Sequence, residues 1–256
     1  LKCSVRPSFE IVLYSGRVVT LFSPDVVIPA FNGEKVISEC INSVSEILPN
    51  SKIIVVDDFS DDSTVDRISN LHSEITLLRN DSNIGFGQTC NEGFLHTESE
   101  WVLILNQDAT LKSFDYGALE GLLSDPEVAI IGGKILDGRD SIHRNIGKTP
   151  HLFRLYLHWP LLPIRFLGLD FASLHDGELD KYEKTQSVPW ISGACLLLHR
   201  QSFVNSGGFD SRYFLYVEEL EYANRVTKSG AKVIFEPSMV AAHEDRSGGP
   251  ISSKAI

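Results

Sequence analysis

Short, unbroken apolar runs recur through the first half of the chain and limit its fold more than any other feature. They cover residues 26–29, 53–56, 75–78 and 101–105. Such runs are typical of strands buried on both faces of a parallel sheet, and segments with apolar residues at helical spacing lie between them. Because strand and helix alternate, the sequence predicts an α/β fold of βαβ units, with a mostly parallel central sheet flanked by helices.

The pattern is less regular elsewhere. Residues around Ser15 and Gly16 alternate apolar and polar, which predicts a β-hairpin. His243 is expected in a polar tail. The elements predicted in the second half are a helix at 119–123, strands at 128–133, 190–198 and 232–235, and a helix from about 217 to 228.

Length and charge limit the kinds of function. At 256 residues, a single α/β domain over residues 1–256 with a sizeable core is expected. The formal net charge is −11, whereas nucleic-acid binding requires clustered Lys and Arg. The charge therefore argues against a nucleic-acid partner, but not against a nucleotide held by a metal ion.

The cysteines and the hydropathy pattern indicate a cytoplasmic protein. Cys3, Cys40, Cys90 and Cys195 are scattered, without CxxC spacing, in contexts typical of reduced, buried thiols. No apolar run reaches the roughly 20 residues that a membrane helix needs, and no signal-peptide pattern is present.

Carboxylates directly follow two of the predicted strands. Asp108 comes after the 101–105 run, behind an Asn-Gln pair, and Asp57 and Asp58 follow 53–56. Ligands of open α/β sheets bind beyond the carboxyl ends of the strands, so these acids are expected around one crevice. Asp108 can hold a divalent cation that bridges to phosphates, and Asp57 can accept hydrogen bonds from a ribose or base. A turn or helix cap is the alternative for each.

A third acidic group begins the last predicted helix. On a helix, Glu218 and Glu221 share a face with Arg225, while Glu219 points elsewhere. A solvated helix start is the ordinary explanation, because carboxylates favour a helix N-terminus. The aromatic flank at 213–216 argues against an ordinary exposed surface and so favours a functional role.

Two further signals are weaker. Residues 83–88 suggest a dinucleotide-binding loop, but Cys90 stands where GxGxxG needs its third glycine. His243 follows a strand among charged residues, which keeps a metal role open beside that of a surface or packed histidine.

Taken in order, these segments resemble the motifs of the inverting family-2 glycosyltransferases, which have the GT-A fold. The resemblance covers Val26 to about His243, and the glycine and metal motifs are most similar to the rhamnosyltransferase-like branch. The segments that carry it are Val27-Ile28-Pro29-Ala30-Phe31-Asn32, Val55-Val56-Asp57-Asp58-Phe59-Ser60-Asp61-Asp62, Asn83-Ile84-Gly85-Phe86-Gly87 with Asn91-Glu92-Gly93, Leu105-Asn106-Gln107-Asp108, Ser192-Gly193-Ala194, Gly207-Gly208-Phe209-Asp210 and Phe214-Leu215-Tyr216-Val217-Glu218-Glu219.

The resemblance implies a nucleotide-binding half at about 24–133 and an acceptor-binding half at about 134–256. Asp57 would bind the nucleobase or ribose, and Asp108 and His243 would hold Mg²⁺ or Mn²⁺ on the diphosphate. The other nucleotide-binding residues it implies are Pro29, Phe31, Asp58, Asn83, Gly85, Asn106 and Gln107.

The resemblance also implies a general base. Glu219 stands in the place of the family's catalytic Asp and would accept the proton of the attacking acceptor hydroxyl, with Glu218 as the fallback. Gly193 and Ala194 would contact the acceptor or sugar. There Trp190 either stacks on a sugar face or belongs to the core.

Two residues depart from the family pattern. Asn106 replaces the first Asp of D-x-D, so metal binding is expected to be weaker. Glu219 replaces Asp and adds a methylene, in a site where an error of about 1 Å can cost about 10²-fold in rate. These departures motivate the alternative of a catalytically inactive sugar-nucleotide-binding or scaffold protein.

The sequence thus predicts a metal-dependent inverting glycosyltransferase. Its donor would be a nucleotide-activated hexose or 6-deoxyhexose, with dTDP-rhamnose the best match to the branch, and its acceptor a polysaccharide or lipid-linked glycan. A sugar-phosphate nucleotidyltransferase would need a Gly-rich basic loop after the first strand, and residues 30–34 are not one. The aromatic stretch 152–171 either faces the acceptor or the inner face of a membrane, as a peripheral contact, or forms a second core cluster.

Overall fold

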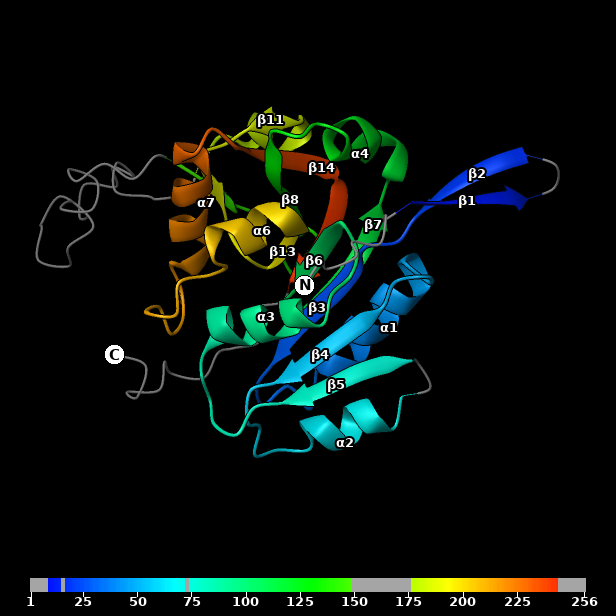
Figure 1. The fold of residues 1–256 in the computed structure, drawn as a ribbon, viewed down its shortest axis with the longest axis vertical. Helices are drawn as coiled ribbons and strands as arrows, with labels where there is room; N and C mark the ends of the chain where they lie inside the picture. Colours follow the sequence, from blue (N-terminus) through cyan, green and yellow to red (C-terminus); the bar gives the residue numbers. More distant parts are fainter. Residues whose placement is uncertain (1–8, 15–16, 72–73, 149–175, 244–256) are drawn as a thin grey trace, which may run out of the picture.

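The computed structural model describes residues 9–14, 17–71, 74–148 and 176–243, so the stretch 152–171 lies outside the described residues. Its main feature is one mixed sheet (Figure 1). In spatial order the strands are β11 (Gln186–Ser187), β14 (Lys232–His243), β8 (Val128–Leu136), β13 (Cys195–His199), β6 (Trp101–Leu105), β3 (Asp25–Ala30), β4 (Ile53–Asp57) and β5 (Ile75–Arg79). At its margins β7 (Ala109–Phe114) pairs with β14 and β9 (Ile142–His143) with β8, while β10 (Ile146–Gly147) and β12 (Trp190–Ile191) form a separate pair.

The apolar runs of the first half form the parallel part of this sheet, as predicted. β3 lies between β6 and β4, and β4 lies between β3 and β5, with every one of these neighbours parallel. The helices that connect them are α1 (Ile37–Ile47), α2 (Thr64–Ser69) and α3 (Phe86–Leu95). The predicted α/β class, with a mostly parallel central sheet flanked by helices, is therefore confirmed.

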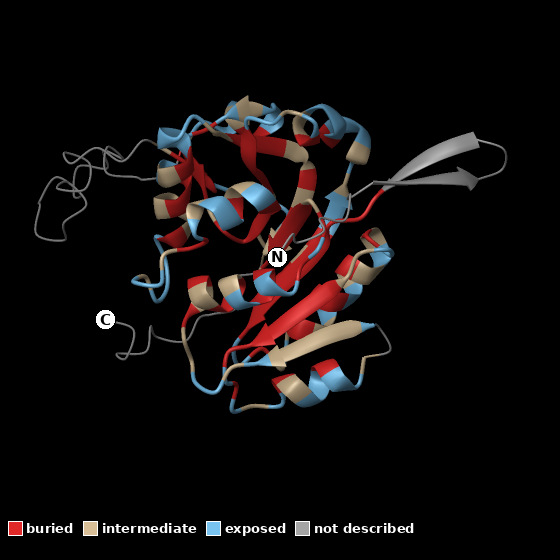
Figure 2. Ribbon diagram, in the orientation of Figure 1, coloured by how far each residue is buried: buried red, intermediate tan, exposed pale blue. Residues whose placement is uncertain are grey.

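Two hydrophobic cores lie on opposite faces of the sheet, because successive strand residues point to opposite faces. Val26 and Ile28 pack in the core that contains α1 and α2, whereas Val27 packs in the core that contains α3. The other helices of the described residues are α4 (Tyr116–Leu123), η3 (Leu179–Glu183), α6 (Arg200–Ser206) and α7 (Glu218–Lys228). Figure 2 shows the central strands buried between these layers, with β5 only partly buried at the edge.

The second half of the chain adds strands of mixed direction, and here several predictions were wrong. The strand expected at 190–198 is broken into β12 and β13, because the chain turns at Gly193 and the carbonyl of Ala194 accepts a hydrogen bond from the N–H of Asn106 (3.1 Å). β14 continues to His243 instead of ending at Phe235. Pro237 and a shift of register beside Glu236 interrupt the apolar alternation, which hides this continuation in the sequence.

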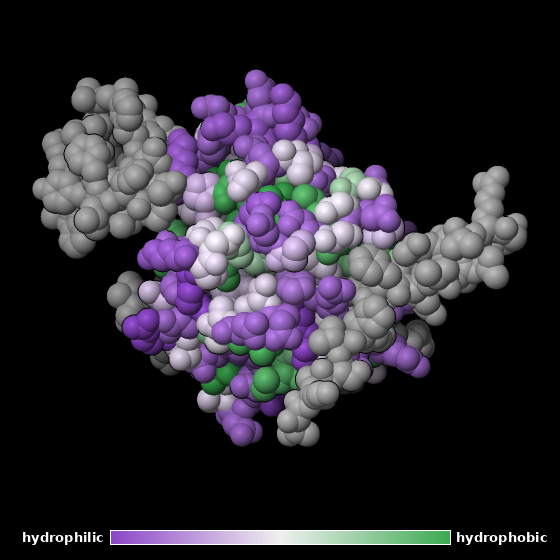
Figure 3. Space-filling view, turned by 45° about the horizontal axis from the view of Figure 1, so that its top comes forward, coloured by the Kyte–Doolittle hydropathy of each residue, from purple (hydrophilic) through white to green (hydrophobic). Residues whose placement is uncertain are grey.

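The hairpin prediction for the start of the chain is confirmed. β1 (Phe9–Tyr14) and β2 (Arg17–Phe22) pair antiparallel, and Figure 1 shows them extending away from the main sheet. The face drawn in Figure 3 is mainly hydrophilic, with small apolar groups between polar ones. Within the described ranges, no helix is long and apolar enough to cross a membrane.

Candidate functional site

The predicted functional residues, with the exception of Trp190, lie at or beside one edge of the sheet. The parallel strands β3, β4 and β6 all end there, so the turns that follow them are neighbours. β13 runs antiparallel to β6, with Cys195 opposite Leu105, so it begins at the same edge. Turns from both halves of the chain therefore meet at this edge, as expected for ligand sites of α/β sheets.

The carboxylate of Asp58 organises the turn that leads into α3. It accepts hydrogen bonds from the N–H groups of Ile84 (2.9 Å) and Gly85 (2.9 Å) and from Nδ2 of Asn80 (2.8 Å). The side chain of Asn83 accepts a further bond from the N–H of Gly85 (3.2 Å). The side chains of Asp58 and Asn83 therefore stabilise the loop at Ile84 and Gly85 through hydrogen bonds to its main chain.

Gly85 is required in this turn for two reasons. Its φ of +88° is the left-handed conformation that glycine adopts without strain. A Cβ at this position would also lie 2.2 Å from the carbonyl oxygen of Phe214, in the segment before α7. The turn thus approaches the segment before α7 closely, and the N–H of Phe86 donates to that same carbonyl (3.0 Å).

Asp57 is fully buried at the end of β4, but its carboxylate is only partly engaged. One oxygen accepts a hydrogen bond from the N–H of Ser60 (3.2 Å) and forms an ion pair with Nε of Arg79 (3.3 Å). The other oxygen has no hydrogen-bond partner among the described residues. A buried unpaired oxygen is costly, so Asp57 is well suited to accept a hydrogen bond from a ligand.

The sequence reasoning missed two neighbours of Asp57. The guanidinium of Arg79 lies 6.0 Å from the ring centre of Phe59, and half of that ring's area is exposed. Phe59 has a φ of +68°, an uncommon conformation for a bulky residue. No spacing rule singles out Arg79, because it lies on a different strand from Asp57.

Gln107 links the ends of two neighbouring strands. Its amide oxygen accepts from the N–H of Phe31 (3.0 Å), and its amide nitrogen donates to the carbonyl of Phe31 (2.8 Å). Pro29 lies two residues earlier in β3, beside Val56 of β4. The polar atoms of Gln107 are therefore engaged by the main chain of Phe31, whose ring stays partly exposed.

Asp108 and His243 meet although they are 135 residues apart in the chain. Nε2 of His243 lies 3.0 Å from Oδ1 of Asp108. The cause is the pairing of β14 with β7, which sets His243 opposite Ala109. The expectation that His243 lies in a polar tail was wrong, because the extended β14 carries it to this position.

The Asp108–His243 pair fits a divalent cation. It offers a carboxylate oxygen and an imidazole nitrogen, and the buried Oδ1 of Asn106 nearby has no hydrogen-bond partner among the described residues. No group of three or more His, Cys, Asp or Glu side chains suited to a metal occurs in the described part of the chain. Cations such as Mg²⁺ are commonly held by one or two protein ligands together with substrate phosphates.

The surroundings of this pair contain further polar residues that the sequence did not reveal. The ring centre of His143 lies 6.4 Å from that of His243. A hollow of about 110 Å³ beside Asp108 is lined in part by Glu39, Lys112 and Asp137. These residues come from α1, β7 and the loop after β8, so only the tertiary structure brings them together.

Glu219 is connected through the Gly193 turn to Asn106, two residues before Asp108. Its Oε1 accepts a hydrogen bond from the N–H of Gly193 (3.3 Å), and the next residue, Ala194, accepts from the N–H of Asn106. Its Oε2 has no hydrogen-bond partner among the described residues. Burial raises the pKa of the Glu219 carboxyl above its ordinary value. Glu219 and Asp108 therefore belong to the same edge of the sheet.

Glu218 is more deeply buried than a solvated helix start would allow. It is 2 % exposed and faces α3, close to Gly87, and its Oε2 has no hydrogen-bond partner among the described residues. Burial, assisted by the nearby charge of Glu219, raises the pKa of Glu218 to about 7. Arg225 forms its ion pair with Glu221. The solvated alternative is thus wrong for Glu218.

Comparison with known proteins decides the family. The family model described as glycosyl transferase family 2 matches residues 25–205. The chain belongs to glycosyl transferase family 2. Among curated family members, it is 26 % identical over 206 residues to the N-acetylglucosaminyl-diphospho-decaprenol L-rhamnosyltransferase of Mycobacterium tuberculosis. That match covers 75 % of this chain and 66 % of the relative, so the chain spans just under two thirds of the relative's length.

Solved structures of other glycosyltransferases share the fold. GalNAc-T7, crystallised with UDP, GalNAc and Mn²⁺, superposes with a TM-score of 0.66 at 17 % identity, over 88 % of this chain and 44 % of that chain. The mannosyltransferase PcManGT of Pyrobaculum calidifontis, in complex with GDP-Man and Mn²⁺, gives a TM-score of 0.59 at 19 % identity, over 88 % and 60 %. The predictions of family 2, of a rhamnosyltransferase-like sequence and of the GT-A fold are therefore confirmed.

One predicted sugar contact of this family-2 chain lies in the core. Trp190 is 6 % exposed, and its Nε1 donates to the carbonyl of Lys148 (3.0 Å). Its ring covers Gly147, where an added Cβ would lie 1.9 Å from the indole. The structure thus favours the core alternative for Trp190, whereas Gly193 and Ala194 lie at the edge beside Glu219.

Proposed function

We propose that the chain is a metal-dependent inverting glycosyltransferase, a single GT-A domain over residues 1–256 with a nucleotide-binding half at about 24–133 and an acceptor-binding half at about 134–256. The observation that carries the proposal is the link from Glu219 through Gly193 and Ala194 to Asn106, two residues before Asp108. This link supports a base and a metal ligand that act at one edge of the sheet.

In the proposed mechanism Glu219 acts as the general base. Its carboxylate accepts the proton of an acceptor hydroxyl while that oxygen bonds to the anomeric carbon of the donor. The bond from this carbon to the diphosphate oxygen breaks on the opposite face, so the anomeric configuration inverts. The raised pKa of Glu219 supports the role, because a base works best when its pKa lies near the operating pH.

Asp108 and His243 would hold Mg²⁺ or Mn²⁺, which as a Lewis acid would stabilise the charge on the departing nucleoside diphosphate. Both solved structures compared above were obtained with Mn²⁺. The free oxygen of Asp57 would accept a hydrogen bond from the nucleobase or ribose, beside Pro29 and the exposed ring of Phe31. In this proposal Asp58, Asn83, Gly85 and Gln107 shape the nucleotide site by holding its loops.

The proposed donor is dTDP-rhamnose and the proposed acceptor is a lipid-linked glycan. Rhamnose and a lipid-linked acceptor are supported by the similarity to the mycobacterial N-acetylglucosaminyl-diphospho-decaprenol L-rhamnosyltransferase, and dTDP-rhamnose is the donor that best matches the rhamnosyltransferase-like branch. A lipid-linked acceptor would bring this cytoplasmic domain into peripheral contact with the inner face of a membrane.

A donor panel tests the proposal. The protein is incubated with dTDP-rhamnose, UDP-GlcNAc, UDP-glucose or GDP-mannose and a glycan diphosphate-lipid acceptor, with Mn²⁺ or with EDTA, and the released nucleoside diphosphate is measured. We expect turnover of one donor, lowered by at least about 100-fold in EDTA, since a Lewis acid supplies several kcal/mol. Metal-independent binding of nucleotides without turnover of any donor would instead favour the non-catalytic alternative.

A further inference from the structure

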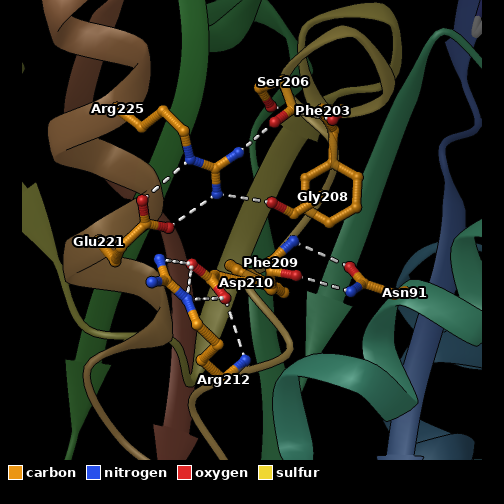
Figure 4. Close-up of polar contacts among 9 residues, drawn as sticks. All are labelled: Asn91, Phe203, Ser206, Gly208, Phe209, Asp210, Arg212, Glu221 and Arg225. Carbon is orange, nitrogen blue, oxygen red and sulfur yellow. Dashed lines mark hydrogen bonds and ion pairs between the residues drawn. The ribbon is translucent and has the colours of Figure 1, made fainter.

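The guanidinium of Arg225, in the last turn of α7, joins two helices of the acceptor half (Figure 4). Its Nε and Nη2 donate to the carboxylate of Glu221 (3.0 and 2.7 Å). Its Nη2 also donates to the carbonyl of Gly208 (2.7 Å), and Nη1 donates to the carbonyl of Ser206. The side chain is half-buried, and the planar fork of an arginine is suited to several such bonds at once.

These carbonyls belong to the end of α6. Ser206 is the last residue of α6, and Gly207 closes the helix in the left-handed conformation (φ +86°). The last carbonyls of a helix have no partners within it, and a cation there also interacts favourably with the helix dipole. Arg225 donates to the carbonyl of Ser206, the last residue of α6, and to that of Gly208 just beyond the helix, and thereby fixes α7 against the end of α6.

Asn91 of α3 holds the next part of the same segment. Its Oδ1 accepts from the N–H of Phe209 (2.9 Å), and its Nδ2 donates to the carbonyl of Phe209 (2.8 Å). Figure 4 shows both bonds beside the contacts of Arg225. Gly208 is required for this approach, since a Cβ there would lie 2.5 Å from Oδ1 of Asn91. The segment 207–217 is therefore held from α3 as well as from α7.

This segment ends in a strained turn at residues 216–217, two residues before the proposed base Glu219. Tyr216 and Val217 have φ values of +65° and +75°, and a β-branched residue such as Val217 resists this conformation. Such conformations persist only where surrounding contacts determine the backbone strongly, and they cluster at functional sites. Asn91 and Arg225 hold residues 206–209 at the beginning of the segment. The hydrogen bond from the N–H of Phe86 to the carbonyl of Phe214 (3.0 Å) holds it two residues before the strained turn.

We propose that Asn91 and Arg225 are positioning residues, which fix the start of α7 and thereby the place of the Glu219 carboxylate relative to the donor. We refer to these two side chains as the backbone clamp. The inference rests on the proposed function, in which Glu219 is the general base. The clamp contacts the main chain of 206–209 and the side chain of Glu221, and acts through that main chain and through α7.

The test compares Arg225→Met with Arg212→Met. Arg212 belongs to the same segment, but its side chain is 81 % exposed and its hydrogen bonds, within the described residues, go to Asp210 alone. We expect Arg225→Met to lower kcat by about 100-fold, because a misplacement of about 1 Å can cost that much. The KM for the donor and the Kd for dTDP, UDP or GDP with Mn²⁺ should change by less than about twofold, and Arg212→Met should leave kcat within about twofold. Arg225→Lys should restore part of kcat.

Asn91→Asp gives a second, smaller change. It keeps an acceptor for the N–H of Phe209 but removes the donor to its carbonyl, and it should also lower kcat without raising the donor KM. Amide hydrogen exchange of residues 207–217 should become faster in Arg225→Met and Asn91→Asp, but not in Arg212→Met. This readout needs no activity, so it tests the clamp even if the wild-type protein turns over no donor and the proposed function fails.

Folded clamp variants with wild-type kcat and wild-type exchange would overturn the inference. Equal losses of kcat in Arg225→Met and Arg212→Met would overturn it as well. If both clamp variants fail to fold and Arg225→Lys shows wild-type kcat, the clamp serves folding alone, and a positioning role is rejected.

Discussion

Two regions of the molecule bury carboxylates to almost the same degree but differ in the hydrogen-bond donors that they provide for them. At the end of β4, Asp58 is 4 % exposed and accepts hydrogen bonds from two backbone N–H groups and the Asn80 amide. At the start of α7, Glu218 is 2 % exposed, yet its Oε2 has no hydrogen-bond partner among the described residues. In the unfolded chain water would hydrogen-bond to both carboxylates. On folding, only Asp58 replaces those hydrogen bonds with donors of the protein.

This difference in hydrogen bonding distinguishes a carboxylate that stabilises a loop from carboxylates that are candidates for proton transfer. A carboxylate with all its donors, such as Asp58, fixes a loop. Glu218 and Glu219 have raised pKa values because burial disfavours their charged forms without enough donors to compensate. Strongly perturbed acids of this kind are candidates for proton transfer. The predictions below test this division, from the largest expected effect to the smallest.

Replacing Glu219 by Gln should have the largest effect, since it removes the proposed base while keeping the shape of the side chain. We expect kcat to fall by about 10²- to 10⁴-fold, the usual contribution of general-base catalysis. Binding of dTDP or UDP with Mn²⁺, measured by calorimetry, should stay at its wild-type strength. The control is Glu46→Gln, at an exposed position of α1. Wild-type turnover by Glu219→Gln would reject the assignment of the base.

Replacing Asp58 by Asn should weaken the fold. The variant loses the negative charge of the side chain that accepts hydrogen bonds from Ile84, Gly85 and Asn80. Hydrogen bonds to charged groups contribute about 1.5–3 kcal/mol each. We expect the free energy of unfolding to fall by about 2–3 kcal/mol, which lowers Tm by roughly 5–10 °C in a domain of this size. Thermal unfolding followed by circular dichroism measures it. An unchanged Tm would contradict the scaffold role of Asp58.

Replacing Glu218 by Gln should stabilise the fold, but only at high pH. The pKa of Glu218 is raised from 4.5 to about 7 in the folded protein. Its contribution to the free energy of unfolding is therefore fully present below pH 4.5 and is lost as the pH rises through about 7. Gln mimics the protonated acid at every pH. At pH 8 we expect a gain of about 1–3 kcal/mol over the wild type, and at pH 4.5 almost none. A gain of equal size at both pH values would show that the charge of Glu218 is not its cause.

The strands of the first half, and the acids at their ends, could be predicted because the signals are local. An unbroken apolar run such as that of β6 must be buried on both faces, and the polar residues that end it must then lie at the edge of the sheet. Asp57, Asp58 and Asp108 were placed in this way. The fold and the family could be predicted for the same reason.

The contacts that complete the site could not be predicted from local patterns, because they depend on pairing between distant segments. That Asp108 and His243 act together was implied by the family resemblance alone. His243 reaches Asp108 only because β14 pairs with β7, and the irregular register of β14 conceals that strand in the sequence. Trp190 is a residue type that can stack on a sugar, yet the pairing of β12 with β10 buries it over Gly147.

The sequence by itself thus determined the type of sheet and the edge that carries the chemistry, since periodicity and strand ends are properties of consecutive residues. Only the tertiary structure decided which carboxylates are satisfied and which are left unpaired. Burial and hydrogen bonding depend on neighbours that the chain brings from far away, as Asn91 and Phe209 meet across 118 residues.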